Sequence, residues 1–366
     1  MLLKHTVALA LAQLGAAQSG GDAPSNRSLA DALASQNATL STLNSILAGQ
    51  PGLVNALSSA QNITILAPSN EAFSSFLSGP GADVSSDAGA VAALLTYHVV
   101  HGAYYANDIL ALNGTQVFPT LLTNETYANV TGGQRVGVSG SAGAVHIFSG
   151  LGTNSSVTTP NVNFTGGTIH IIDQVLTIPP SDTALLSAGN LSALAGALTQ
   201  ADLGTTVSGL KDVTIFAPTN AAFGAISGIV ANLSTAELTG ILTYHVVHGR
   251  VIYAQDIKNG STAQALNNGT LKFTVEPDGS VFVNGAKVVA TNNFAANGVV
   301  HLIDNVLNPN NTATPPPSAT TGTPAFGAPA PTGSHSPGSA AAGLGTQGAV
   351  AAAALFGGLA VLANVF

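Results

Sequence analysis

Three sequence blocks occur twice in this chain, in the same order. The first copies are ITILAPSNEAF, LLTYHVVHG and GTIHIIDQVL, at residues 63–73, 94–102 and 167–176. The second copies are VTIFAPTNAAF, ILTYHVVHG and GVVHLIDNVL, at residues 213–223, 241–249 and 298–307. Ordered duplication of this kind indicates two homologous units in tandem. Each unit exceeds the about 20–50 residues of a solenoid repeat, so each is expected to fold around its own core.

The distance between the two copies changes along the unit. It is 150 residues for the first block, 147 for the second and 131 for the third. The first unit therefore carries about sixteen extra residues between its second and third blocks. Segment 113–166 is rich in Gly, Asn, Ser and Thr and predicts hairpins joined by an extended loop. We expect the extra residues, around 119–165, to form a protruding glycosylated loop, because a longer surface loop costs little entropy.

The blocks resemble the signature boxes of the fasciclin domain family. That family has a Thr-x-Phe-Ala-Pro-Thr-Asn-x-Ala-Phe box, then a Tyr-His pair, then a Gly-x-x-His-x-Ile-Asp-x-Val-Leu box. The second copy matches all three, whereas in the first Leu66 replaces the phenylalanine and Ser69 the threonine. The resemblance covers 26–179 and 183–308, and Pro179-Pro180 predicts a short, stiff linker between them. It implies an α+β fold class: two tandem fasciclin-like domains, each a β-sheet wedge with several short α-helices.

Residues around the blocks predict local structure of that type. Leucines from Leu29 to Leu57 recur at helical spacing and predict short amphipathic helices. The β-branched run Ile63–Ala67 predicts a strand, and Ser69 or Asn70 can cap the helix that follows it. In the second unit, Asn284-Gly285 is typical of a two-residue hairpin turn.

Composition limits the classes of partner and of stabilising chemistry. Charged residues make up 7% of the chain, its formal net charge is −8, and its 8 Lys and Arg residues are scattered. Nucleic-acid binding needs clustered positive charge, so no nucleic-acid partner is expected. The chain contains no Cys, which excludes disulfides, thiolate metal ligands and cysteine nucleophiles. Each domain must therefore be stabilised by its core alone.

Both ends of the chain carry targeting signals. Residues 1–17 combine a basic start, an apolar run and small residues, which is the order of a cleaved secretory signal peptide. Residues 309–337 are rich in Pro, Thr, Ser, Gly and Ala and predict a disordered stalk open to O-glycosylation. In 338–366, small residues, a spacer and an apolar tail predict a GPI-anchor signal, with Gly338 or Ser339 as the attachment residue.

A single transmembrane helix is the rival interpretation of the apolar tail. Residues 349–366 are at the short end for a span of about 30 Å. No Lys or Arg follows them to hold a cytoplasmic end, so we favour the lipid anchor.

Asn-x-Ser/Thr sequons are unusually dense. They begin at Asn26, Asn37, Asn62, Asn113, Asn124, Asn129, Asn154, Asn163, Asn190, Asn232, Asn259, Asn268 and Asn310. Glycans need solvent, so most of these residues should lie at the surface. With so few charged residues, the glycans are the expected source of solubility.

Histidines raise the question of a metal site. The chain has His98 and His101 in one Tyr-His block, His245 and His248 in the other, and His170 and His301 in the closing blocks. The Tyr-His blocks contain no Asp or Glu, and Asp173 should face away from His170 because side chains alternate along a strand. We therefore expect no metal and no cofactor.

The Tyr-His pairs are candidates either for partner contact or for the core. In animal fasciclin domains this region is linked to integrin binding, which by resemblance points to Tyr97, His98, Tyr244 and His245. Their apolar neighbours favour the other role, with His98 and His245 as partly buried imidazoles hydrogen-bonded to a neighbouring segment.

Catalytic signatures are absent from the sequence. It has neither a G-x-S-x-G elbow nor a phosphate-cradling glycine loop. Ser208 and Lys211 fit S-x-x-K, but that pattern is short and common. Asp108 and Asp256 each follow a Tyr-His block without a paired carboxylate, which favours a turn or helix cap over acid–base catalysis.

The resemblance implies an adhesion protein. We expect an extracellular, GPI-anchored glycoprotein that acts by binding cell-wall or matrix glycans or proteins, or another cell-surface protein, at the plasma membrane or transferred to the wall. The stalk lacks long Ala-Pro and Ser-Pro repeats, which favours a fungal over a plant source. One alternative is a secreted enzyme that modifies wall polysaccharide, which needs two carboxylates in one cleft. Another is a carrier of lipid or another small ligand, which needs an enclosed apolar cavity.

Overall fold

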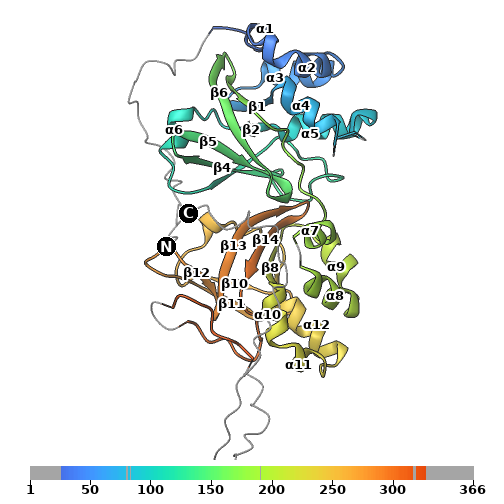
Figure 1. The fold of residues 1–366 in the computed structure, drawn as a ribbon, viewed down its shortest axis with the longest axis vertical. Coiled ribbons are helices and arrows are strands. Elements are labelled where there is room, and N and C mark those ends of the chain that lie inside the picture. Colours follow the sequence, from blue (N-terminus) through green and yellow to red (C-terminus); the bar gives the residue numbers. More distant parts are fainter. Residues whose placement is uncertain (1–25, 80, 83, 190, 316–318, 327–366) are drawn as a thin grey trace, which may run out of the picture.

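The computed structural model describes residues 26–326 except 80, 83, 190 and 316–318. These residues form two domains stacked along the long axis of the molecule (Figure 1). The predicted signal peptide, the predicted anchor signal and Asn190 lie outside the described residues. Within the described part, no helix has the length and hydropathy that a membrane crossing requires.

Helices precede and interrupt the strands in a similar order in both domains. The first contains α1 (Leu29–Ser35), α2 (Asn37–Ala48), α3 (Pro51–Ser59), β1 (Ile63–Pro68), α4 (Asn70–Leu77), η1 (Val84–Ser86), α5 (Ala88–Tyr97), β2 (Val99–His101), α6 (Ala106–Leu110), β3 (Gln116–Pro119), β4 (Arg135–Ser141), β5 (Ala144–Phe148), η2 (Gly150–Gly152), β6 (Asn154–Phe164) and β7 (Gly167–Ile172). The second contains α7 (Asp182–Ala188), α8 (Ser192–Gln200), α9 (Gly204–Gly209), β8 (Val213–Pro218), α10 (Asn220–Ala225), α11 (Ser227–Val230), α12 (Thr235–Tyr244), β9 (Val246–Val247), η3 (Ala254–Asp256), β10 (Thr262–Gln264), β11 (Thr270–Val275), β12 (Val281–Val283), β13 (Ala286–Ala295) and β14 (Gly298–Ile303).

Each domain is organised around a seven-stranded sheet of the same topology. The strand order is β2-β1-β7-β6-β5-β4-β3 in the first domain and, read in the same direction, β9-β8-β14-β13-β12-β11-β10 in the second. β1 runs parallel to β7, and β8 runs parallel to β14. The strand of the first sequence block therefore lies beside that of the third block, which explains why the two blocks recur together. The predicted fold class, two tandem α+β domains, is confirmed.

A glycine at the start of each third block permits this parallel pairing. A Cβ atom on Gly167 would lie 1.8 Å from the carbonyl oxygen of Ile63. A Cβ atom on Gly298 would lie 1.8 Å from the carbonyl oxygen of Val213. No other residue fits so close to a neighbouring backbone.

Both faces of the sheet are buried at its parallel strands, β1, β7, β8 and β14. On β1, Ile63, Ile65 and Ala67 pack in the cluster that holds the leucines of α1–α3, whereas Leu66 packs on the opposite face with Tyr97. This alternation follows from the period of two along a strand. Ser69 caps α4 by accepting a hydrogen bond from the amide of Ala72, one of the two caps predicted.

The predicted protruding loop at 119–165 is wrong. About half of this segment forms β4, β5 and β6 within the sheet, because its valines and isoleucines alternate along the strands and are largely buried. The extra length lies mainly at 120–134, between β3 and β4, where the second domain has only 265–269 between β10 and β11. We call 120–134 the insert. It packs against the second domain.

Part of the predicted stalk also packs against the second domain. The carbonyl oxygen of Ala325 accepts hydrogen bonds from the side chains of Asn308 (3.2 Å) and Asn311 (2.9 Å). The amide of Gly322 donates to Asp304 at 2.7 Å, and Phe326 packs against the apolar cluster beneath α7–α9. Residues 319–326 thus form a strap on the folded domain, contrary to the prediction that disorder begins at 309.

Candidate functional site

The Tyr-His pairs lie where a long helix meets the sheet. Tyr97 ends α5 and His98 caps it, while Tyr244 ends α12 and His245 caps it. His98 is 4% exposed and His245 is 2% exposed. Both imidazoles therefore belong to the core, and are more deeply buried than the partial burial predicted for them.

Each imidazole joins its helix to the segment after the last strand. His98 Nε2 accepts from the amide of Leu176 (2.9 Å), and His245 Nε2 accepts from the amide of Leu307 (2.8 Å). The other ring nitrogen, Nδ1, must then carry the proton, and it donates to the carbonyl four residues earlier at 2.7 and 2.8 Å respectively. Burial lowers the pKa of both histidines to about 4, so both are neutral at physiological pH.

Each tyrosine joins the same helix to a hairpin strand of the sheet, β4 in the first domain and β11 in the second. Tyr97 donates its hydroxyl proton to the Arg135 carbonyl at 3.0 Å, and Tyr244 donates to the Thr270 carbonyl at 2.8 Å. The hydroxyl of Tyr244 also accepts from the side chain of Asn284, in the predicted hairpin turn, at 2.8 Å. Neither tyrosine is more than 1% exposed, so neither side chain can touch a partner while its domain is folded.

The remaining block histidines divide into buried and exposed pairs. His170 Nε2 and His301 Nε2 each donate to a backbone carbonyl at 2.8 Å, that of Tyr104 and that of Ile252. His101 and His248 are exposed. The described residues hold no group of three or more His, Cys, Asp or Glu side chains suited to a metal ion.

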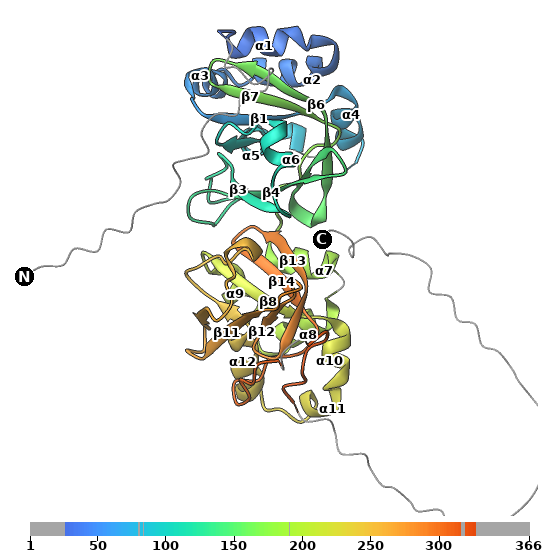
Figure 2. The same ribbon diagram turned by 90° about the vertical axis from the view of Figure 1, so that its left-hand side faces the viewer.

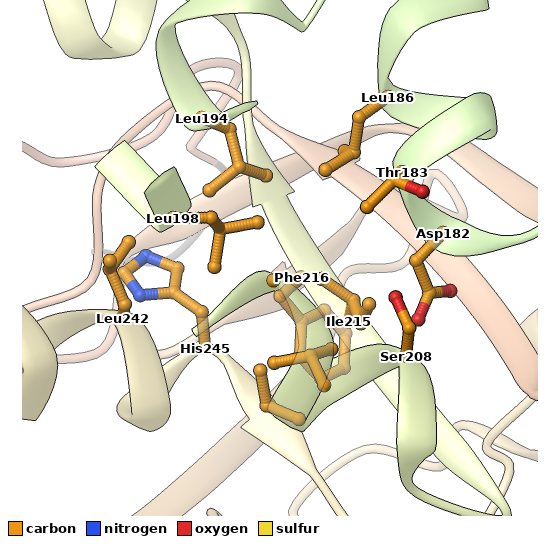
Figure 3. A pocket seen from close by; sticks show the side chains of 13 residues that line it. Asp182, Thr183, Leu186, Leu194, Leu198, Ser208, Ile215, Phe216, Leu242 and His245 are labelled. Atoms are coloured by element: carbon orange, nitrogen blue, oxygen red, sulfur yellow. The ribbon is translucent and has the colours of Figure 1, made fainter. Parts of the chain in front are cut away.

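Ser208 and Lys211, the two residues of the S-x-x-K pattern, have different surroundings. Lys211 forms an ion pair with Glu125 of the first domain, with Nζ and Oε1 at 3.2 Å. Ser208 lies on α9, and its hydroxyl is buried beside the carboxyl group of Asp182 (Figure 3). The pair therefore does not form a Ser-Lys dyad.

Asp182 is a buried acid that the sequence patterns did not reveal. It is 4% exposed, and burial raises its pKa to about 6. One carboxylate oxygen accepts from the side chain of Asn297 at 2.9 Å, and the other has no hydrogen-bond partner among the described residues. Comparison of the two copies could have found it, because both α1 and α7 follow a capping serine and the residue after that serine is Leu29 in one and Asp182 in the other.

Enclosed space in the two domains is small. The cavity beneath α7–α9, shown in Figure 3, has a volume of about 20 Å³, and its counterpart beneath α1–α3 has about 30 Å³. A further open groove of about 490 Å³ lies over α1–α3 of the first domain, lined mainly by Leu and Ala side chains. The internal cavities are far smaller than the ligand pockets of about 300–1,000 Å³ found in binding proteins.

The two domains meet where β3 and β4 of the first lie above β13 of the second (Figure 2), and the insert contributes polar contacts to this junction. Gln134 is fully buried there and donates to the carbonyl of Ala295 at 3.0 Å. Thr131 donates to both carboxylate oxygens of Asp212, at 2.6 Å from its amide and 2.6 Å from its hydroxyl. The linker is held as well, because the amide of Ala296 donates to the Pro180 carbonyl at 2.8 Å.

An apolar cluster lies beside these polar contacts. Val117 of β3 packs with Tyr253, Phe294 and Val299 of the second domain. The guanidinium of Arg135 lies 5.5 Å from the centre of the Tyr253 ring, a cation–π distance. The junction thus combines an apolar centre, a buried amide and a rim ion pair. Its only trace in the sequence is the extra length of the first copy.

Comparison with known proteins gives the same two units. The fasciclin domain family model matches residues 38–179 and 189–309. A fasciclin-like arabinogalactan protein of Arthroderma benhamiae is 37% identical over 291 residues, which cover 78% of this chain and 68% of that protein. The fasciclin-like arabinogalactan protein elcF of Phaeosphaeria nodorum is 33% identical over 276 residues, covering 75% and 86%. Human periostin is 32% identical over 153 residues, covering 40% of this chain and 18% of periostin.

The duplicated blocks, the shared sheet topology and the two family matches agree. Each domain carries its Tyr-His pair and its closing strand at the same place in the fold. The chain belongs to the fasciclin domain family.

Proposed function

We propose that this protein acts by binding at the cell exterior, as an adhesion or wall-organising glycoprotein. Its family and its fungal relatives support a cell-surface or matrix role. The observation that carries the proposal is the use of the Tyr and His side chains of the blocks in core hydrogen bonds. What remains to meet a partner is the outer surface of the two docked domains, so Tyr97, His98, Tyr244 and His245 are proposed as structural residues.

The partners proposed are cell-wall or matrix glycans or proteins. With only 7% charged residues, the chain carries far more hydroxyl and amide side chains than charged ones. Recognition by such groups depends little on ionic strength, unlike recognition by charged patches. Binding should therefore survive high salt.

We propose that the protein is N-glycosylated and held by a GPI anchor at Gly338 or Ser339. Of the sequon asparagines that the structure describes, all but Asn129 and Asn163 are exposed. A phosphatidylinositol-specific phospholipase should release the protein from membranes. Retention with the tail peptide 349–366 still attached would favour the transmembrane alternative.

A binding array tests the proposal most directly. The secreted chain, released from its anchor, is applied to immobilised wall polysaccharides, matrix proteins and cell-surface proteins at low and high salt. Saturable, salt-resistant binding supports the proposal. Cleavage of an applied polysaccharide would instead support the enzyme alternative, in which case paired carboxylates must be sought.

The groove over α1–α3 favours one second candidate, a carrier of small apolar ligands. It is lined by Leu29, Leu33, Leu47 and Leu57, and its volume suits such a ligand. A fluorescent fatty acid should then bind the protein, and Ala34→Arg, at an exposed wall of the groove, should abolish binding while Ala188→Arg, at the exposed end of α7 in the second domain, should not.

A further inference from the structure

Two sequons lie five residues apart in the insert, in opposite surroundings. Asn124 is exposed, and its side-chain oxygen accepts a hydrogen bond from the amide of Thr126 within its own turn. Asn129 is half-buried at the junction with the second domain. The two residues therefore form a matched pair for asking what the junction does to a glycosylation site.

Asn129 contacts the second domain with three groups. Its amide donates to the carbonyl of Ala296 at 2.6 Å, and its carbonyl accepts from the amide of Asp212 at 3.3 Å. Its side-chain nitrogen Nδ2 donates to the carbonyl of Leu210 at 3.3 Å. Nδ2 is the atom to which an N-linked glycan is joined, so the attachment point faces the other domain.

The hydroxyl residue of this sequon is engaged as well. Thr131 binds the carboxylate of Asp212 through both its amide and its hydroxyl. The Leu210 carbonyl that receives Asn129 also accepts from Asn297, which in turn binds Asp182. The sequon is thus tied into the hydrogen bonds that position the first helix of the second domain.

We infer that a glycan on Asn129 and the docked pair of domains exclude each other. A sugar ring on Nδ2 needs solvent beside that nitrogen, whereas in the docked structure the Leu210 carbonyl of the second domain lies 3.3 Å from it. The first domain is synthesised before residues 210–212 exist, so glycan transfer can precede docking. A glycan on Asn129 then keeps the two domains of that molecule joined by the linker alone. A molecule without this glycan has docked domains.

Thiol labelling tests the access to Asn129, because the chain contains no Cys. Asn129→Cys and Asn124→Cys are made separately in the full chain, produced without glycans. A maleimide carrying a large polymer should label Cys at 124 at least tenfold faster than Cys at 129 in the native protein, and equally fast after denaturation. Equal native rates would overturn the inference.

A second measurement follows docking itself. Lys211 and Glu125 lie 3.2 Å apart across the junction, so a zero-length carbodiimide should cross-link them only in docked molecules. Each variant is labelled while unfolded and then refolded. The polymer at 129 should reduce the cross-link at least tenfold, whereas the same polymer on Asn37→Cys, an exposed sequon position on α2, should leave it unchanged. An unchanged cross-link with the polymer at 129 would contradict the proposed exclusion.

The third measurement uses the glycosylated protein, produced in a secretory host and treated with the carbodiimide. Mass spectrometry of glycopeptides should find Asn124 occupied and Asn129 bare in the molecules that cross-link. Molecules with a glycan at 129, where present, should fail to cross-link. A glycan at 129 in cross-linked molecules would show that the junction accommodates it, and the inference would be wrong.

Discussion

The two domains share their interiors and differ where they meet. Both place the Tyr-His pair, the closing histidine and the parallel strand pair at the same positions. The first domain alone has the long insert, and the second alone has Asp182 and Asn297, where the first has Leu29 and Gly166. The duplicated copies have thus kept the contacts that close each domain, while they differ in the insert and in the residues beneath α7.

This asymmetry has a consequence for assembly. A junction made of two different surfaces could in principle repeat head to tail, as heterologous interfaces do. Here the second domain lacks an insert with which to engage a third domain, and the first has Asn62 where the second has Asp212, the acid that receives Thr131. The contacts of this junction therefore do not repeat from the second domain to a third.

The largest effect should come from the feature that both domains share. Gly167→Ala and Gly298→Ala each place a methyl group into a backbone carbonyl, and each should unfold its own domain, at a cost of about 4 kcal/mol or more. Gly196→Ala is the matched control, because a Cβ atom there meets open space within α8. Circular dichroism melts should show loss of one transition for the first two variants and an equal or higher midpoint for the control.

Histidine replacement should separate structure from binding. His245→Ala leaves the amide of Leu307 and the carbonyl of Ile241 without partners, which should destabilise the second domain by roughly 1–3 kcal/mol. His98→Ala should do the same to the first domain. Ligand binding by the folded fraction should be unchanged in both. Lost binding with an unaltered melting temperature would make the imidazole a contact residue.

The pH dependence should differ between the domains because of Asp182. Burial raises the pKa of this carboxyl from 3.8 to about 6, so its stabilising contribution is full below about pH 4 and is lost as pH rises through 6. The buried histidines act in the opposite direction. Their pKa falls from 6.5 to about 4, so their contribution is full above pH 6.5 and is lost as pH falls through 4.

Asp182→Asn should therefore stabilise the second domain at neutral pH. The expected gain is about 2 kcal/mol at pH 7.5, and roughly half of that at pH 5, where much of the wild-type acid is already protonated. Denaturant titrations at both pH values measure it. The first domain, with Leu29 at the matching place, serves as the internal reference, and exposed Asp202→Asn should change neither domain. An equal gain at both pH values would exclude the titration of Asp182 as its cause.

The smallest effect should come from the ion pair at the rim. Lys211 and Glu125 have side chains that are 45% and 78% exposed, so solvent screens their attraction. Lys211→Ala should lower stability by less than about 0.5 kcal/mol. Gln134→Ala should loosen the junction far more, since it leaves the carbonyl of Ala295 without its partner. Hydrogen exchange at the amides of 295–297 would rank the two variants.

Much of each domain could be predicted from the sequence because its signals are local. The hairpin turn at Asn284-Gly285, the cap at Ser69 and the strand at 63–68 follow from residue types and short spacing. The insert was misjudged for the opposite reason. Its composition is that of a surface loop, and only contacts with residues 80 or more positions away show that it is an interface.

Asp182 escaped prediction on similar grounds. An acid in the first turn of a helix is favourable and is normally solvated, so its position suggests an ordinary surface residue. It is buried because Asn297, 115 positions later, closes over it. The depth of His98 and His245 likewise depends on the segments at 176 and 307, which the local pattern does not contain.

The parallel strand pair has a mechanical meaning for a protein of the cell exterior. β8 and β14 are joined along six consecutive residue pairs, and the strap at 319–326 must be released before a pull on the following chain reaches β14. A pull that drags β14 along its own axis loads these hydrogen bonds together instead of opening them one by one. Resistance to force is a matter of unfolding rate rather than equilibrium stability. Gly167 and Gly298 let these strands approach. Each domain therefore resists shear between its first and last strands, β1 and β7 or β8 and β14.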